Sequence, residues 1–324
     1  MAENISHLKF SPNNRFLSIT SGRRVSLFAC PSPSTKGRLL EPFLLIRRFN
    51  TESTHVVTHF NFSDDSRFMI YSSDDHVLRT VGTLGGDFPR AKLRGHKSHI
   101  LGSVSYLDIN KRLLSIDRAG LVFLWELVQS ESEGKGFKTL TGKNINRKME
   151  KKSISGIRLS PLEEAFQNSR FILKTKLLLF QENTQIDQLA FSNDKEHLTV
   201  AFKNHSFGVY RINSFSPDNL VQNLMTFRKD ESFGKVLSLI MHPTKPLISF
   251  GDSKKSLVVW DWKAKNYLLK QRALSGVVTA VAFSQENRYL AVGDAFGFLK
   301  VFDFRSLLNT VTFEDANGKI SAVR

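Results

Sequence analysis

The side chains that could carry out chemistry are dispersed along this 324-residue chain and form no recognisable catalytic group. Its nine histidines are dispersed along the chain, and paired cysteines and a phosphate-binding glycine loop are both absent from the sequence. Two adjacent carboxylate pairs, Asp64-Asp65 and Asp74-Asp75, stand where hairpin turns are expected. Neighbouring residues of a strand point to opposite faces, so a shared carboxylate site is not expected at either pair.

Two further reactive side chains lack the neighbours that catalysis requires. His242 precedes Pro243 and is predicted to be a turn residue, and Cys30 precedes Pro31 with no base beside it. Nucleophilic catalysis needs an activating base within hydrogen-bond reach. The sequence therefore predicts a protein that is not an enzyme, with no catalytic residue, cofactor, metal or small-molecule substrate.

A repeated pattern of turns and aromatic residues organises the chain. Gly95-His96 is followed by Trp125-Glu126, and the second half of this pattern returns at Trp260-Asp261 and Phe302-Asp303. A Gly-His turn before the first strand and a Trp-Asp pair closing the third are typical of a four-stranded propeller blade of ~40–45 residues. Similar turn anchors begin at Phe10, Phe62, Phe191, Met241 and Phe283.

The apolar runs between these anchors have a period of two, which indicates strands. Ala280-Val281-Ala282-Phe283 and Leu257-Val258-Val259-Trp260 are examples, bounded by turn-forming residues. We predict an all-β fold, a WD-repeat β-propeller forming one domain over residues 1–324, with about six blades, the start of a seventh at Lys319, and one basic insertion. The blades are expected at about residues 5–49, 55–93, 98–180, 186–227, 235–271 and 277–313.

The insertion occupies residues 129–152 within the third blade. Its apolar side chains are too sparse to bury a face, so we expect a flexible arm that proteases cut first. Charge-rich segments often stay unfolded until they bind a partner, and a solvated loop is the alternative. The candidate contacts with RNA or an acidic partner are Lys143, Arg147, Lys148, Lys151 and Lys152.

The charge of the whole chain favours polyanionic partners. There are 46 Lys and Arg against 30 Asp and Glu, a net charge of +16, and basic pairs such as Arg23-Arg24 and Lys254-Lys255 are scattered. Lys and Arg side chains that bind the phosphates of RNA release the counterions condensed on it. We therefore predict RNA binding that weakens with salt and does not depend on the RNA sequence. The single cysteine cannot form an internal disulfide. With no signal peptide and no apolar run of ~20 residues, we expect a protein inside the cell and no membrane partner.

The run Leu257-Val258-Val259-Trp260-Asp261-Trp262, followed by Tyr267-Leu268-Leu269-Lys270-Gln271, resembles the repeat of the periodic tryptophan protein 2 family. Order and spacing are similar from about residue 55 to the end. Members of that family are large nucleolar proteins with two tandem propellers and a helical C-terminal region. They are structural subunits of the UTP-B subcomplex of the small-subunit processome, and this chain covers less than half of that plan.

The resemblance implies a scaffold in the nucleus and nucleolus that serves pre-rRNA processing and 18S rRNA biogenesis. The implied partners are other UTP-B and processome proteins, U3 small nucleolar RNA and pre-rRNA, contacted directly or through the complex. The alternative is a general WD-repeat adaptor, such as a ubiquitin-ligase substrate receptor that binds a short peptide.

The signature residues Gly95, His96, Trp125, Trp260, Asp261 and Trp262 are expected to be structural. Ala119 replaces the usual hairpin aspartate before Gly120, so His96 and Trp125 are expected to hold an incomplete hydrogen-bond network. Trp260 should pack against the neighbouring blade. Trp262, just past the strand end, should matter less for stability.

The ends of the chain are expected to leave the ring open or poorly sealed. The seventh blade contributes only one short run at its start, and an unpaired edge strand is a template for association. We therefore expect the edges near residues 5–10 and 320–323 to need a partner or a second copy for stability.

Overall fold

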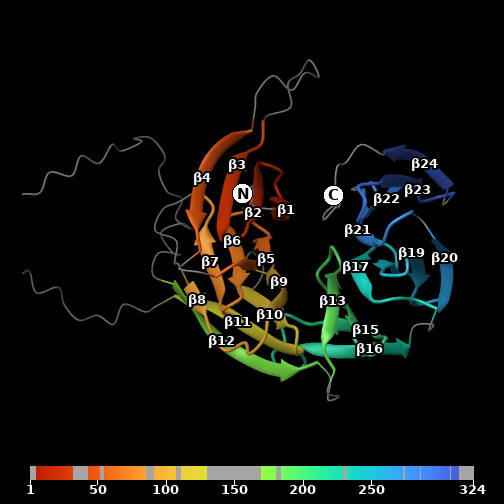
Figure 1. The fold of residues 1–324 in the computed structure, drawn as a ribbon. Coiled ribbons are helices and arrows are strands. Elements are labelled where there is room, and N and C mark those ends of the chain that lie inside the picture. Colours follow the sequence, from red (N-terminus) through yellow and green to blue (C-terminus); the bar gives the residue numbers. More distant parts are fainter. Residues whose placement is uncertain are drawn as a thin grey trace, which may run out of the picture.

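The computed structural model describes residues 5–31, 43–51, 55–84, 91–106, 111–129, 169–179, 184–228, 232–272, 274–284, 286–306 and 308–313. Every helix or strand in these ranges is a β-strand, and the strands form six four-stranded sheets. The sheets follow one another around a ring in sequence order (Figure 1). The predicted all-β propeller with six blades is confirmed.

Each blade consists of four consecutive antiparallel strands, and we number the blades 1 to 6 along the chain. The strands are β1 (Ile5–Phe10), β2 (Phe16–Ser21), β3 (Arg24–Ala29), β4 (Leu44–Asn50), β5 (Val57–Phe62), β6 (Phe68–Ser73), β7 (Leu78–Gly82), β8 (Ala91–Leu93), β9 (Ile100–Tyr106), β10 (Arg112–Asp117), β11 (Leu121–Gln129), β12 (Ser169–Leu178), β13 (Ile186–Phe191), β14 (His197–Phe202), β15 (Ser206–Ile212), β16 (Val221–Arg228), β17 (Val236–Met241), β18 (Leu247–Asp252), β19 (Ser256–Asp261), β20 (Asn266–Arg272), β21 (Val278–Phe283), β22 (Tyr289–Asp294), β23 (Leu299–Asp303) and β24 (Leu308–Phe313).

A serine-centred turn explains the repeated anchors of the sequence. In blade 2, Ser63 Oγ accepts the backbone N–H of Phe68 at 2.9 Å and donates to the carboxylate of Asp65. Blades 1 and 4 build the same turn around Ser11 and Ser192. Because one side chain satisfies both ends of the turn, the first hairpin of each blade is set locally.

In blade 5 a histidine replaces this serine. His242 Nδ1 accepts the backbone N–H groups of Thr244 and Lys245 at 3.2 and 3.1 Å. Burial, helped by the charge of Lys245, lowers the pKa of His242 to about 4, so the ring stays neutral and able to accept. His242 is the turn residue that the sequence predicted.

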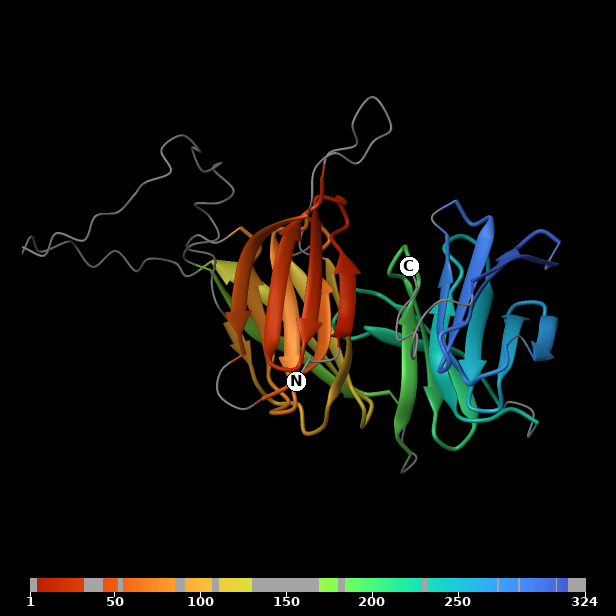
Figure 2. The ribbon, with the colours of Figure 1, turned by 45° about the horizontal axis from the view of Figure 1, so that its top comes forward.

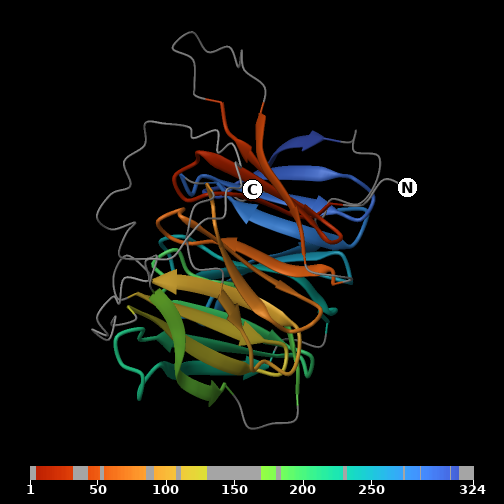
Figure 3. The same ribbon diagram turned by 90° about the vertical axis from the view of Figure 1, so that its left-hand side faces the viewer.

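The apolar core lies between the blades. Five clusters of buried side chains join blades 1 and 2, 2 and 3, 3 and 4, 4 and 5, and 5 and 6. Between blades 1 and 2, for example, Val25 and Leu27 of β3 pack against Met69 and Tyr71 of β6. Figure 3 shows the outer side of the first blades, whose sheets stack side by side. Each blade is therefore stabilised mainly by its neighbours.

Blades 1 and 6 meet differently from every other pair. The innermost strands β1, β5, β9, β13, β17 and β21 each contact the next one around the ring, but β21 and β1 make no contact of comparable extent. Figures 1 and 2 show the first blade (red) and the last blade (blue) standing apart. Within the described part of the chain, none of the apolar clusters joins these two blades. We call this junction the seam.

Several sequence-based expectations fall outside the described residues. The insertion predicted at residues 129–152 begins on the last residue of β11, Gln129, and its remainder lies outside the described residues, because nothing between residues 130 and 168 is described. The same holds for residues 320–323. No helix long and apolar enough to cross a membrane occurs in the ranges given above.

Candidate functional site

The Gly-His and Trp-Glu signature of blade 3 forms a complete hydrogen-bond network. His96 Nε2 lies 2.8 Å from Ser115 Oγ, which also accepts the indole N–H of Trp125 at 3.0 Å. His96 Nδ1 lies 3.1 Å from Asp117 Oδ2, and both of these side chains are fully buried. A buried polar network stabilises a fold when each member has its partner, which is the case here.

The expectation that this network is incomplete is therefore wrong. It placed the hairpin aspartate at position 119, where the chain has alanine. The carboxylate comes instead from Asp117, the last residue of β10. Its Oδ1 accepts the backbone N–H groups of Ala119 and Leu121, both at 3.0 Å, while Oδ2 faces His96. The aspartate closes the hairpin from the strand end and leaves the turn position free for alanine.

In blades 5 and 6 an aspartate also ends the second strand, but it bonds to the backbone directly and not to a histidine. Asp252 ends β18 and Asp294 ends β22, and both are fully buried. Their Oδ2 atoms accept the backbone N–H of Gly234 at 2.7 Å and of Gly276 at 2.8 Å, in the loops that precede these blades. A Cβ on Gly276 would lie 2.8 Å from Asp294 Oδ2, so glycine permits this direct bond.

Trp260 packs against the neighbouring blade, as predicted. Its side chain is 5% exposed, and its ring centroid lies 3.8 Å from that of Phe227 in blade 4. Trp262 follows the end of β19, but it is only 9% exposed and its ring approaches His197 of blade 4 at 5.8 Å. Both indoles are thus buried against blade 4, and the smaller effect expected for Trp262 on stability stays a prediction. Asp261 caps the following turn by accepting two backbone N–H groups.

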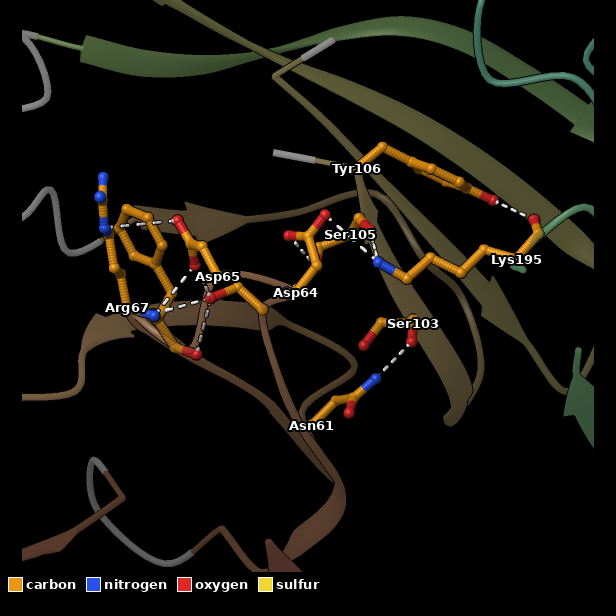
Figure 4. Close-up of polar contacts among 10 residues, drawn as sticks. Asn61, Asp64, Asp65, Arg67, Ser103, Ser105, Tyr106 and Lys195 are labelled. Carbon is orange, nitrogen blue, oxygen red and sulfur yellow. Dashed lines mark hydrogen bonds and ion pairs between the residues drawn. The ribbon is translucent and has the colours of Figure 1, made fainter. Parts of the chain in front are cut away.

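A polar network joins blades 2, 3 and 4 on the face of the ring that carries the first hairpin turns (Figure 4). Asp64 accepts the hydroxyl of Ser105 at 3.0 Å, and its backbone N–H donates to the same hydroxyl at 2.9 Å. Lys195 Nζ lies 3.2 Å from the Asp64 carboxylate and donates to the carbonyl of Ser105 at 2.9 Å. One lysine of blade 4 is thus bonded to both preceding blades.

Two more bonds extend this network. The hydroxyl of Tyr106 donates to the carbonyl of Lys195 at 2.7 Å, and Asn61 Nδ2 donates to the carbonyl of Ser103 at 2.8 Å. Burial raises the pKa of the Tyr106 phenol, and the nearby carboxylates of Asp194 and others add to the effect. The phenol therefore stays protonated and donates throughout the physiological pH range.

The ion pair between Asp64 and Lys195 can be measured with a double-mutant cycle. The two side chains are 13% and 27% exposed, so water screens them only in part. We expect the single variants Asp64→Asn and Lys195→Met to show a coupling energy of about 0.5–1 kcal/mol in urea unfolding, and we expect it to shrink at high salt. A coupling energy of zero at low salt would contradict the view that this ion pair stabilises the contact between blades 2 and 4.

A groove of about 730 Å³ lies beside this network and is lined by residues of blade 4 together with Tyr106 of blade 3. Asp194, Glu196 and Asp218 line it, and Arg211 pairs with Glu196 at 3.9 Å. Phe215, in the turn between β15 and β16, also lines it and is 66% exposed. Exposed aromatic side chains beside a polar groove suit the docking of a protein segment.

A second cavity, of about 420 Å³, lies where the innermost strands of blades 1 to 5 converge. Lys9, His59 and Asn193 are among its lining residues. His59 Nε2 lies 2.9 Å from Ser103 Oγ. Burial, together with the charges of Lys9 and His7, holds the pKa of His59 well below its usual range. His59 is therefore neutral at physiological pH and acts as a structural group.

The adjacent carboxylates have separate partners, as expected for turn residues. Each member of the two pairs is engaged by a different basic side chain. The partners are Lys195 for Asp64, Arg67 for Asp65, His55 for Asp74 and Arg79 for Asp75. Cys30 is a half-buried free thiol. In the part of the chain that the structure describes, no group of three or more His, Cys, Asp and Glu side chains could hold a metal ion.

Two of the scattered basic pairs lie on the same face of the ring. Arg23-Arg24 occupies the turn between β2 and β3, and Lys254-Lys255 the turn between β18 and β19, and all four side chains are exposed. Consecutive strands reverse direction in every blade, so the second hairpins all close on the face opposite the first hairpins. The predicted contacts Lys143, Arg147, Lys148, Lys151 and Lys152 lie outside the described residues.

Sequence reasoning missed the residues that complete these networks. Asp117 had a usable signal, because Asp252 and Asp294 also end a second strand before a hairpin turn. No signal in the sequence marked Ser105 or Lys195, since their hydrogen-bond partners come from other blades. Ser115 becomes recognisable only once β10 is aligned with β11.

The similarity to known proteins agrees with the family resemblance drawn from the tryptophan-rich run. No family model matches the chain. The periodic tryptophan protein 2 homolog of Schizosaccharomyces pombe is 25% identical over 295 residues, covering 89% of this chain and 30% of that protein. The Caenorhabditis elegans homolog is 26% identical over 305 residues, covering 90% of this chain and 31% of that protein. Periodic tryptophan protein 2 of Arabidopsis thaliana is 24% identical over 356 residues, covering 99% of this chain and 38% of that protein.

The resemblance to periodic tryptophan protein 2 is thus confirmed over nearly the whole described propeller. The chain spans about a third of the length of the curated relatives it matches.

Proposed function

We propose that this chain is a non-catalytic scaffold of a nucleolar ribonucleoprotein, the small-subunit processome, and serves pre-rRNA processing and 18S rRNA biogenesis. The observation that carries the proposal is the similarity to periodic tryptophan protein 2 along almost the entire chain. The relatives are about three times longer than this chain. The role of a full-length relative is therefore only proposed for this chain.

The surfaces of the propeller support a role in binding. The groove that blade 4 and Tyr106 line on the first-hairpin face can hold a segment of a partner protein, and Phe215 offers an apolar anchor there. The basic turns of the opposite face can contact phosphates. Since the blades pack rigidly on one another, the two faces would hold their partners in a constant relative orientation. The proposed partners are UTP-B and processome proteins, U3 small nucleolar RNA and pre-rRNA, in the nucleolus.

Co-purification tests this proposal. The tagged chain should enrich U3 small nucleolar RNA, 18S precursors and UTP-B proteins from cell extract. A chain of net charge +16 also binds RNA non-specifically, so another abundant small nucleolar RNA serves as the internal control. Recovery of U3 RNA no higher than this control, with a ubiquitin-ligase subunit in the eluate, would favour the WD-repeat adaptor instead.

RNA binding by the second-hairpin face can be tested with a matched pair of variants. Lys255 and Lys265 both lie in exposed turns of blade 5 with positive φ, 69° and 57°, but on opposite faces. We expect Lys254→Glu/Lys255→Glu to weaken binding of a structured rRNA fragment by on the order of tenfold, and Lys263→Glu/Lys265→Glu to have a smaller effect. Filter binding or fluorescence anisotropy would measure both.

The salt dependence is the second readout of this experiment. Binding of the unaltered chain should fall on the order of tenfold or more between ~50 and ~200 mM salt, and unrelated rRNA fragments should bind alike. Equal loss in the two double variants would mean that charge acts without a preferred face. An affinity that ignores salt, or that depends on one short sequence, would contradict electrostatic binding.

A further inference from the structure

Two histidines and an arginine come together on the second-hairpin face, where blades 2 and 3 meet. His76 lies in the turn between β6 and β7, His99 directly precedes β9, and Arg118 lies in the turn between β10 and β11. The rings of His76 and His99 meet edge to face, with centroids 4.8 Å apart. Arg118 adjoins them, because its backbone N–H donates to the carbonyl of His99 at 2.8 Å. We call these three residues the histidine–arginine cluster.

The cluster contains polar atoms that have no hydrogen-bond partner among the described residues. These atoms are His76 Nδ1, His99 Nδ1 and Arg118 Nε. All three residues are half-buried, so part of each still faces solvent. Polar groups that are shielded from water and lack a partner are rare in folded proteins. Since no hydrogen bond holds either Nδ1, a half-turn of an imidazole can bring that nitrogen toward a ligand without breaking a bond.

The carboxylates near the cluster already have partners of their own. Asp74, whose charge acts on His99, pairs with His55 at 2.8 Å. The next residue, Asp75, is bound by the guanidinium of Arg79. Neither carboxylate is therefore available to the cluster as an acceptor. Donors and positive charge exceed the acceptors at this place on the face.

Exposed basic side chains stand near the cluster and elsewhere on the same face. Arg94 and Lys97 precede His99 in its loop, and both are exposed. The exposed turns Arg23-Arg24 and Lys254-Lys255 close on this face in blades 1 and 5. Cations at several separate places suit a polyanion, which offers phosphates at intervals, better than a ligand with a single phosphate.

We propose that the histidine–arginine cluster binds a backbone phosphate of RNA. The planar guanidinium of Arg118 can donate two parallel N–H bonds to phosphate oxygens, and each imidazole can donate one. The phosphate supplies the acceptors that the three side chains lack. This inference deepens the RNA contact proposed above for the second-hairpin face and rests on it.

Binding at this site depends on pH through the histidines. Burial, helped by the charges of His76 and Arg118, lowers the pKa of His99, and Asp74 opposes this only in part. The ring of His99 is therefore mostly neutral at physiological pH. A bound phosphate places a negative charge beside the ring and raises that pKa, so RNA binding is accompanied by proton uptake. The affinity for RNA should then rise as the pH falls from about 7.5 to about 5.5.

Arg118→Gln and Lys203→Gln form a matched pair of variants for the site. Both residues directly follow the second strand of a blade on this face, β10 and β14, and the backbone N–H of each donates to a carbonyl at 2.8 Å. Each variant removes one positive charge, but only the first removes it from the cluster. With the structured rRNA fragment, Arg118→Gln should weaken binding about fivefold or more, and Lys203→Gln less than about twofold.

His76→Asn and His205→Asn form the second pair. The two histidines occupy the same position of the second hairpin in blades 2 and 4, with φ of 61° and 65°, a left-handed conformation that asparagine also adopts. At constant salt, His76→Asn should lose most of the gain in RNA affinity between about pH 7.5 and about pH 5.5, whereas His205→Asn should keep it. His99→Gln should behave like His76→Asn. Thermal midpoints would show that each variant is folded.

Equal RNA affinities of Arg118→Gln and Lys203→Gln would overturn the proposal, because the cluster would then contribute only general charge. The same conclusion would follow if His76→Asn and His99→Gln kept the pH dependence of the unaltered chain. Binding of a phosphoserine peptide that Arg118→Gln abolishes, with RNA binding unaffected, would assign the cluster to a phosphorylated protein segment instead. None of these results changes the co-purification with U3 RNA, so failure of the site is distinguishable from failure of the proposed function.

Discussion

Replacement of Trp260 by alanine is expected to lower the free energy of unfolding by about 3–5 kcal/mol. The indole is 5% exposed, and it packs on Phe227 across the junction of blades 4 and 5. Truncation removes the buried apolar surface and leaves a cavity that the two stacked sheets cannot easily close. Urea unfolding followed by circular dichroism would measure the change without relying on tryptophan fluorescence.

The controls for this variant come from the same blade. Trp262→Ala should also destabilise by more than about 2 kcal/mol, because its ring is 9% exposed and contacts blade 4. Leu268→Ala removes a side chain that is 44% exposed on β20, so its effect should stay below about 1 kcal/mol. If Trp262→Ala behaved like Leu268→Ala, the burial of Trp262 described above would be wrong.

Asp117→Ala is expected to have a similarly large effect, about 3–5 kcal/mol. The substitution removes the partner of His96 Nδ1 and the acceptor of the Leu121 backbone N–H, while the Ala119 N–H keeps Ser98 Oγ as an acceptor at 3.0 Å. A buried polar group that loses its partner costs about 1–3 kcal/mol, and the side chain of His96 is fully buried. The same urea unfolding experiment would report the loss.

Two comparisons separate this network from an ordinary turn. Asp117→Asn keeps an oxygen that can accept the two backbone N–H groups, so it should cost less than Asp117→Ala. Asp261→Ala also loses two bonds to backbone N–H groups, but these lie at an exposed turn where water can replace them. A loss for Asp117→Ala no greater than that for Asp261→Ala would contradict a stabilising role for the buried network.

Much of the fold could be predicted because its signals are local. The turn around Ser63 needs only residues within the same hairpin, and alternating apolar residues specify a strand without reference to the rest of the chain. The position of Trp260 at the end of a third strand followed from the same pattern. Six blades could therefore be read from anchors and periodicity alone.

The candidate site was less accessible, because its bonds join residues that are distant in the sequence. Lys195 meets Asp64 only when the turns of blades 2 and 4 converge on one face of the ring. In the hydrogen-bond network of blade 3 the aspartate was expected at position 119 and therefore thought to be missing, since the distance from His96 to Asp117 depends on the pairing of β9 and β10. Position 119, two residues after Asp117, looked equivalent until β9 and β10 were aligned.

By itself, the sequence determined the all-β repeat, the similarity to periodic tryptophan protein 2 and the positive charge, since composition, periodicity and short motifs do not depend on how blades meet. The tertiary structure alone decided that Trp262 is buried, that Asp117 completes the network, and that none of the apolar clusters of the described residues joins blades 1 and 6. Burial and inter-blade bonding are properties of pairs of surfaces. The linear sequence shows each surface separately, and only the stacked sheets show which surfaces contact one another.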